Sequence, residues 1–286
     1  MGVVEKSGEL VRQTSTSIPG DVEKALKRAY AREEKGSAAA TVLKTILENC
    51  ALARRQSTPL CQDTGTLTFF VDWRLRRRVT LATVRRVVAR ATELGYLRKN
   101  CIDSVSGASR DDNGALGTIN LHYIDAVTER PQITLLMKGG GSENMSRQYS
   151  LPDAALGAGR DMAGVRKCIL HAVAETQGYG CAPGILGVCI GGDRATGYEV
   201  AKAQLLRALD EKACGGSMAD PSLCELSAME RLVLRQANSL GIGPMGLGGK
   251  TTLLGVKIAA RSRLPASFFV TVAYMCWAAR RRSIEL

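Results

Sequence analysis

The sequence predicts an irregular α+β fold, in which mixed sheets are flanked by helices. Apolar residues recur at helical spacing through the first sixty residues and again in later stretches. Short runs rich in β-forming residues lie between these stretches. Because helices and strands do not alternate strictly, the pattern disfavours a regular alternating α/β fold. The 286 residues, 45% of them hydrophobic, are enough to bury a large core.

The N-terminal half predicts helices that are followed by strands. Helical spacing covers residues 21–30 and 41–52, and a strand is expected at 66–71. Thr80 then opens a helix whose apolar residues share one face. Two further strands, 118–124 and 132–137, flank Glu129-Arg-Pro131, so we expect these two strands to pair as a hairpin.

The C-terminal half repeats the mixture of helices and strands. Helices are expected at 153–175, 198–209 and 223–240, and strands at 185–190, 253–258 and 268–275. No linker, internal repeat or low-complexity tract interrupts the chain. We therefore expect one domain over residues 1–286.

The charge balance is strongly basic and is also compatible with a different class of protein. Lys and Arg number 39 against 27 Asp and Glu, a net charge of +12. Such charge suits a polyanion, so a basic nucleic-acid-binding or structural protein is one alternative. Few aromatic residues are present to stack on single-stranded bases. The runs at residues 74–78 and 280–282 are expected to be solvated or partner-facing surface.

The chain predicts a soluble, cytoplasmic protein. Its N-terminus lacks the apolar segment of a secretion signal. No stretch approaches the roughly 20 apolar residues that span a bilayer, and the odd cysteine count does not suit a disulfide scaffold.

One glycine-rich segment, residues 241–252, contains two patterns that invite a nucleotide-binding interpretation, but the context of neither supports it. Gly241, Gly243 and Gly246 match a dinucleotide fingerprint, but the expected order is helix before and strand after, the reverse of what binding requires. Gly249-Lys250 lacks the spacing of a phosphate loop, because Pro244 stands where its first glycine belongs. The three glycines that follow Lys138 end a predicted strand, where they weaken regular structure and suit close approach to a ligand.

Nine cysteines occur without any Cys-x-x-Cys pair, which disfavours a zinc finger or a ferredoxin-type cluster. Most are expected to be core residues. Cys61, Cys181 and Cys276 differ, because each stands at the boundary of a predicted element, where side chains can converge. A cluster held by three thiolates leaves one iron open as a Lewis acid. Their spacing alone does not distinguish a role in core packing from a role in metal binding for these three cysteines.

Five segments in order, extending over almost the whole chain, resemble the class I, iron–sulfur-dependent fumarate hydratases. The resemblance is to the cluster-binding N-terminal part of that family, which many bacteria and archaea make as a separate alpha subunit. The segments are Pro59-Leu-Cys-Gln-Asp-Thr-Gly65, Lys138-Gly-Gly-Gly-Ser-Glu-Asn144, Cys181-Ala-Pro183 with Ile190-Gly-Gly192, Gly241 to Thr251, and Pro265-Ala-Ser267 with Cys276-Trp-Ala278.

The resemblance implies a 4Fe-4S cluster and a role for each matching residue. The cluster ligands fall on Cys61, Cys181 and Cys276. Gln62 and Asp63 match residues that touch substrate, with the Asp63 carboxylate as the proton-transfer group. Arg98 matches the arginine that would clamp a substrate carboxylate, and Gly141 matches the glycine whose backbone approaches the substrate.

The implied activity is reversible hydration of fumarate to L-malate, and the related L-tartrate dehydratase alpha subunit is the alternative. The family's C-terminal domain is absent from this sequence, so the resemblance implies a separate beta subunit, an alpha2-beta2 assembly, and no activity for this chain alone. Two departures bear on substrate choice: Leu264 stands where many members have histidine, and residues 109–116 differ from the family's Asn-Thr-rich stretch. The family acts on a small dicarboxylate, with neither nucleic acid nor membrane as partner.

Overall fold

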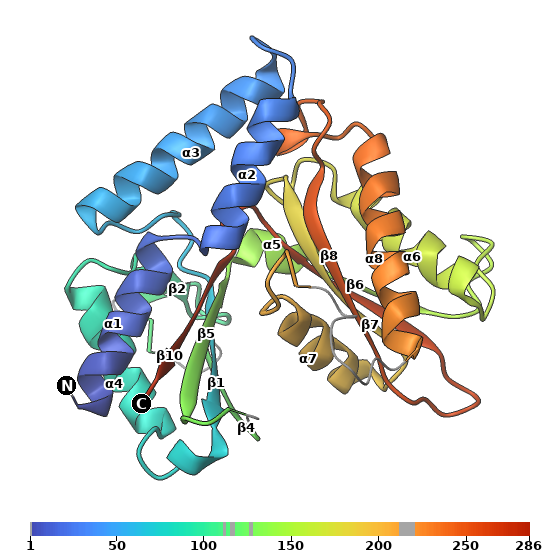
Figure 1. The fold of residues 1–286 in the computed structure, drawn as a ribbon. Coiled ribbons are helices and arrows are strands. Elements are labelled where there is room, and N and C mark those ends of the chain that lie inside the picture. Colours follow the sequence, from blue (N-terminus) through green and yellow to red (C-terminus); the bar gives the residue numbers. More distant parts are fainter. Residues whose placement is uncertain (1, 111–112, 115–117, 126–127, 212–220) are drawn as a thin grey trace. The chain divides into compact units, whose positions relative to one another are not determined.

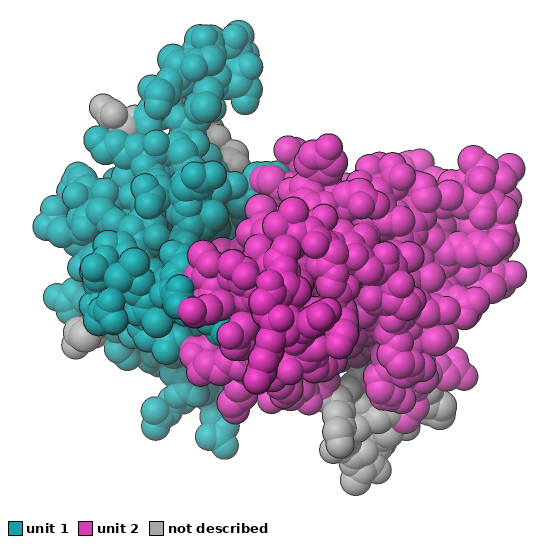
Figure 2. Space-filling model, turned by 90° about the horizontal axis from the view of Figure 1, so that it is seen from above, with its two compact units in different colours: residues 1–19, 46–140, 278–286 teal, residues 20–45, 141–277 magenta. Residues whose placement is uncertain are grey.

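The computed structural model describes residues 2–110, 113–114, 118–125, 128–211 and 221–286. It confirms an α+β fold with mixed sheets and flanking helices (Figure 1). The chain divides into two compact units (Figure 2). Unit 1 contains residues 1–19, 46–140 and 278–286, and unit 2 contains residues 20–45 and 141–277. Each unit has its own sheet and its own apolar core.

The sheet of unit 1 has β5 and β1 as its inner strands. Its strands are β1 (Thr66–Asp72), β4 (Ile119–Ile124), β5 (Gln132–Lys138) and β10 (Arg280–Glu285), in the order β10-β5-β1-β4. β1 pairs in parallel with β4 and antiparallel with β5. The predicted hairpin of 118–124 with 132–137 is therefore wrong. The buried β1 separates the two strands, because its apolar residues are best covered with a strand on either side.

Two helices cover one face of this sheet. α1 (Val3–Thr16) and α4 (Leu81–Glu93) pack on the face that carries Leu67, Phe69 and Leu135. The expected start of α4 is confirmed, since the hydroxyl of Thr80 accepts a hydrogen bond from the Thr83 amide at 3.3 Å. Unit 1 also contains a short 3-10 helix (Trp73–Leu75) and the two-residue strands β2 (Cys101–Ile102) and β3 (Ser109–Arg110).

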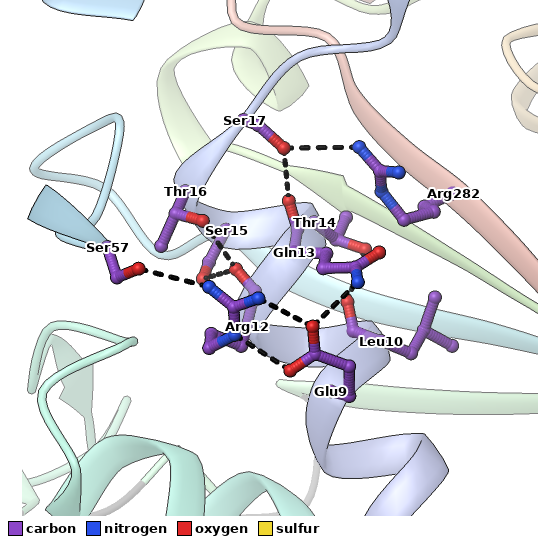
Figure 3. A network of polar contacts seen from close by, with 10 residues as sticks. All are labelled: Glu9, Leu10, Arg12, Gln13, Thr14, Ser15, Thr16, Ser17, Ser57 and Arg282. Carbon is purple, nitrogen blue, oxygen red and sulfur yellow. Dashed lines mark hydrogen bonds and ion pairs between the residues drawn. The ribbon is translucent and has the colours of Figure 1, made fainter. Parts of the chain in front are cut away.

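A polar network fastens the C-terminal end of α1 to its surroundings (Figure 3). Arg12 donates to both carboxylate oxygens of Glu9, at 2.7 and 2.5 Å, and to the hydroxyl of Ser57 at 3.0 Å. Arg282 of β10 donates to the Ser17 hydroxyl at 3.1 Å. The network thus joins α1 to a loop and to the last strand of the same unit.

The basic run at 280–282 differs from its prediction as solvated or partner-facing surface. It forms part of β10, paired antiparallel with β5. Arg280 is 1% and Arg281 8% exposed. The prediction was wrong because charge alone was used, whereas this run supplies the backbone that completes the edge of the sheet beyond β5. The run at 74–78, by contrast, is exposed at Arg74, Arg77 and Arg78.

The sheet of unit 2 has helices on both faces (Figure 1). Its order is β6-β9-β7-β8, from β6 (Arg147–Ser150), β9 (Phe269–Met275), β7 (Gly184–Ile190) and β8 (Leu253–Ala260). β7 pairs in parallel with β8 and antiparallel with β9, and all its residues are buried. α6 (Met162–Thr176) and α8 (Pro221–Ser239) cover one face, and α7 (Arg194–Gln204) covers the other.

The remaining helices and the helix starts refine the predicted boundaries. α2 (Gly20–Arg32) and α3 (Ala38–Gln56) confirm the predicted early helices, and a five-residue helix, α5 (Gly140–Asn144), directly follows β5. α6 begins nine residues later than the predicted 153–175, because Asp161 caps it by accepting the Gly164 amide at 2.7 Å. In the described part of the chain, no helix combines the length and apolar character needed to cross a membrane.

Candidate active site

The segment that carries Cys61 lies in unit 1, between α3 and β1. Cys61 is half-buried, and the amide of Asp63 points at its sulfur with an N to Sγ distance of 3.4 Å. Gly65 has a positive φ of 74°, and a side chain there would collide with the backbone carbonyl of Lys138. The turn after Cys61 is thus pressed against the glycine loop at the end of β5.

Asp63 reaches directly into that glycine loop. Its Oδ2 accepts a hydrogen bond from the Gly140 amide at 2.6 Å. A methyl group on Gly139 would lie 2.9 Å from the same oxygen, whereas nothing lies within 4 Å of the corresponding position on Gly141. The first glycines therefore make room for the carboxylate, and Gly141 is left facing open space. Contrary to expectation, the last two of the three glycines begin a helix, α5.

Arg98 is held beside this turn by its backbone. The hydroxyl of Thr64 accepts from the Arg98 amide at 3.0 Å and donates to the Arg98 carbonyl at 2.8 Å. Asn113 also donates to that carbonyl at 2.8 Å. The side chain of Arg98 is exposed, so the guanidinium is accessible to a ligand while its backbone is fixed.

The residues that hold Arg98 in place were missed by the sequence analysis. Thr64 and Asn113 act across 34 and 15 residues of chain. Asn100 similarly donates to the Gln62 carbonyl at 3.1 Å. The one available signal was that Thr64 stands within the first matching segment. Unit 1 therefore brings Cys61, Gln62, Asp63 and Arg98 into one loop cluster.

Cys181 and Cys276 lie in unit 2, and their segments are joined by the backbone. The amide of Trp277 donates to the Cys181 carbonyl at 3.2 Å. Cys181 is exposed and has a φ of 52°, in the left-handed region that non-glycine residues seldom adopt. Cys276 is 9% exposed and directly follows β9. Unit 2 therefore brings these two predicted ligands together.

The glycine loop at 241–249 supports the Cys181 segment and does not form a phosphate site. It runs from the end of α8 to β8, which confirms the order that disfavours a dinucleotide fingerprint. The Lys250 amide donates to the carboxylate of Glu33, at 3.0 and 2.9 Å, so it is not available for a phosphate. The Met245 amide donates to the Ala182 carbonyl at 2.9 Å.

Three of the other cysteines are core residues, as expected from the sequence. Cys50, Cys168 and Cys189 are at most 2% exposed. Burial raises the pKa of Cys168 to about 11 and also raises that of Cys189, which keeps these thiols protonated. Among the described residues, no group of three or more His, Cys, Asp or Glu side chains is arranged so that it could hold a metal ion.

The structure describes one of the two departures from the family pattern in full and the other only in part. Leu264 is 74% exposed, in the segment between β8 and β9. Of the stretch 109–116, residues 111–112 and 115–116 lie outside the described residues.

The described geometry defines a class of protein. The chain is an α+β protein. The loop cluster of unit 1 carries a thiol, a carboxylate and an accessible guanidinium, which are groups suited to a small anionic ligand. The family model described as fumarate hydratase (fumerase) matches residues 4–285. The chain therefore belongs to the fumarate hydratase family.

Individual relatives have two kinds of name. A Geobacillus stearothermophilus protein, provisionally named fumarate hydratase class I, is 44% identical over 287 residues, which are 99% of this chain and 54% of that protein. This chain thus spans about half the length of that relative. A Methanocaldococcus jannaschii protein, provisionally named L(+)-tartrate dehydratase subunit alpha, is 31% identical over 96% of this chain and 93% of its own. The Escherichia coli K12 L(+)-tartrate dehydratase subunit alpha is 28% identical over 94% and 86%.

Proposed function

We propose that this chain is the alpha subunit of a hydro-lyase that interconverts fumarate and L-malate. The observation that carries the proposal is the loop cluster of unit 1, where Asp63, Arg98 and Cys61 are held by the turn at 61–65 and its hydrogen bonds. A hydration needs a proton-transfer group and a cation for a carboxylate. Asp63 and Arg98 supply these two groups. In this proposal residues 1–286 are one cluster-binding domain.

Cys61, Cys181 and Cys276 are the proposed ligands of a 4Fe-4S cluster. These three thiolates would hold the cluster, which would supply Lewis-acid chemistry for the loss or gain of hydroxide. The residues fit such a group: an amide points at the Cys61 sulfur, and the Cys181 and Cys276 segments are bonded to each other. Thiol ligands also require a reducing compartment, so we place the enzyme in the cytoplasm.

The chain's own residues bind the diacid and move its proton. The guanidinium of Arg98 pairs with a substrate carboxylate through two parallel N–H bonds. The Gln62 amide and the Gly141 backbone are exposed and complete the polar contacts to the small dicarboxylate. The Asp63 carboxylate exchanges a proton at the carbon next to the one that carries the hydroxyl. Its bond to the Gly140 amide fixes its position.

A beta subunit is the proposed partner, in an alpha2-beta2 assembly. Support comes from the two named alpha subunits, which this chain matches over nearly their whole length. The longer fumarate hydratase relative fits the same view, since about half of it lies outside the match. Neither nucleic acid nor membrane has a part in this function.

L-tartrate is the alternative substrate, and the named alpha subunits favour it. Fumarate comes first because the relative named fumarate hydratase is 44% identical, against 31% and 28% for the two tartrate dehydratase subunits. The test is anaerobic co-purification with the beta subunit, followed by kcat/KM on malate and on L-tartrate. A higher kcat/KM on tartrate would overturn the choice of fumarate.

The cluster ligands are tested with cysteine variants of the same complex. Cys61→Ser, Cys181→Ser and Cys276→Ser are each expected to lose bound iron and the broad visible absorbance of an iron–sulfur cluster. Cys50→Ala is the matched control, because Cys50 is a buried helix residue and should retain both signals. A wild-type complex that takes up no iron would contradict the proposed cofactor.

A further inference from the structure

Tyr274 is a residue of unit 2 whose hydroxyl group is buried. Its side chain is 2% exposed, within the core cluster that also contains Leu186 and Val188. Among the described residues, its hydroxyl oxygen has no hydrogen-bond partner. Burying a hydroxyl without a partner costs about 1–3 kcal/mol. A phenylalanine would fill the same space without that cost, so the hydroxyl needs an explanation.

The phenol ring lies against the loop that carries Cys181. Gly180 precedes Cys181 and Gly184 begins the strand after it, and a side chain on either glycine would collide with the Tyr274 ring. At Gly184 the collision includes the hydroxyl oxygen itself. Both glycines therefore keep room for the ring, and the hydroxyl is positioned next to the Cys181 loop.

Tyr274 is equally close to the second predicted ligand along the chain. It stands two residues before Cys276, at the end of β9. The two cysteine segments meet there, through the bond from the Trp277 amide to the Cys181 carbonyl at 3.2 Å. The unpartnered donor thus lies where the segments of two proposed cluster ligands come together.

We propose that the Tyr274 hydroxyl donates a hydrogen bond to a sulfur atom of the cluster and thereby positions and tunes it. This inference rests on the proposed function. A hydrogen bond to a cluster sulfur withdraws negative charge from the metal centre and raises its reduction potential. The same bond holds the ligand sulfurs in place, as partners of metal ligands generally do.

The test compares wild type with Tyr274→Phe in the co-purified complex after anaerobic reconstitution with iron and sulfide. The variant is expected to have a more negative reduction potential and to lose iron to a chelator about tenfold faster. Tyr149→Phe is the matched control, because Tyr149 is a buried tyrosine of the same core whose hydroxyl already pairs with His171 at 3.0 Å. This control should keep the wild-type potential.

The outcomes separate this inference from the proposed function. A wild-type complex without a cluster would overturn both. A wild-type complex that holds a cluster, together with an unchanged potential and chelation rate in Tyr274→Phe, would overturn the role of Tyr274 alone. If Tyr274→Phe does not fold, Tyr274→His and Tyr274→Leu are compared. The histidine keeps a ring donor and should have the higher potential, and equal potentials would overturn the inference.

Discussion

Asp63 shows how one side chain links the loop geometry to chemistry. Its amide points at the Cys61 sulfur, and its carboxylate accepts the Gly140 amide. The contact of the carboxylate needs the space that Gly139 leaves, because a side chain there would lie 2.9 Å from the Asp63 Oδ2 atom. The residue therefore ties the proposed ligand loop to the glycine loop, and proton transfer is its proposed role.

Replacing Asp63 by asparagine separates proton transfer from structure. Asp63→Asn keeps an oxygen that can accept the Gly140 amide but removes the ionisable group. We expect kcat on malate to fall about 10²–10⁴-fold, the usual contribution of a positioned acid or base, with iron content unchanged. Steady-state assays and iron analysis of the complex measure this. Asp125→Asn, at an exposed position, is the control, and a wild-type kcat in Asp63→Asn would remove Asp63 from the reaction.

The ionisation of Glu9 makes the stability of the fold depend on pH. The hydrogen bond from Arg12 is the largest of the contacts that lower the pKa of Glu9, with Gln13 and the charges of Arg12 and Arg282 adding to it, and burial opposes them. Since the folded-state pKa lies below the ordinary value of 4.5, the ionised carboxylate stabilises the fold above that pH. The stabilisation is lost as the pH falls through the folded-state pKa.

The Glu9→Gln variant is expected to be less stable than wild type at pH 7 by up to about 1 kcal/mol, as for other partly exposed ion pairs. The difference should shrink below pH 4.5, where the wild-type carboxyl becomes protonated. Urea unfolding at a series of pH values measures it. Glu34→Gln, at an exposed position, should match wild type at every pH. A Glu9→Gln difference that does not change with pH would mean that its ionisation contributes nothing.

At the scale of elements, helix starts are set by single capping residues. Asp161 accepts the Gly164 amide and begins α6, whose last residue, Thr176, lies against the position of Gly180 before Cys181. We expect Asp161→Ala to lower the free energy of unfolding by about 1 kcal/mol. Asp161→Asn keeps an acceptor oxygen and should cost much less. Urea denaturation compares them, and equal losses in both variants would show that the cap does not stabilise α6.

The elements also show what local pattern can and cannot predict. Helix and strand positions followed from apolar spacing and from caps such as Thr80, because these signals lie within a few residues. Strand partners did not follow, since β1 separates 118–124 from 132–137 and that choice depends on the whole sheet. β10 was missed because a run of arginines has no strand-like alternation, yet β5 supplies its hydrogen-bonding partner.

The candidate site was predictable to the extent that its residues lie within recognisable segments. Cys61, Gln62, Asp63 and the glycine loop stand in two of these, and the structure brings the two together. Thr64, Asn100 and Asn113 were not predicted, because their roles consist of hydrogen bonds to residues that are distant in the chain. The Tyr274 hydroxyl needed a structure as well, since only burial shows that it lacks a partner.

For the whole molecule, the net charge of +12 overstates the number of basic side chains that are accessible to a polyanion. Arg280 and Arg281 are buried in β10, so two of the excess cations do not form an accessible basic surface. Arg98 is exposed but belongs to the proposed diacid site. Arg74, Arg77 and Arg78 remain exposed, so it is the family assignment, and not the charge distribution, that disfavours the nucleic-acid alternative.

The last prediction concerns the chain without its partner. A diacid carries two carboxylates, and Arg98 is the guanidinium proposed here to bind one of them. We therefore expect the isolated chain to take up iron but to show no measurable dehydration of malate, and the beta subunit to restore turnover. Fumarate formation is followed by its ultraviolet absorbance, with and without the partner. A complex that contains Asp63→Asn is the control, because it should assemble and still turn over slowly. Turnover by the isolated chain at the rate of the complex would contradict the division of the site between two subunits.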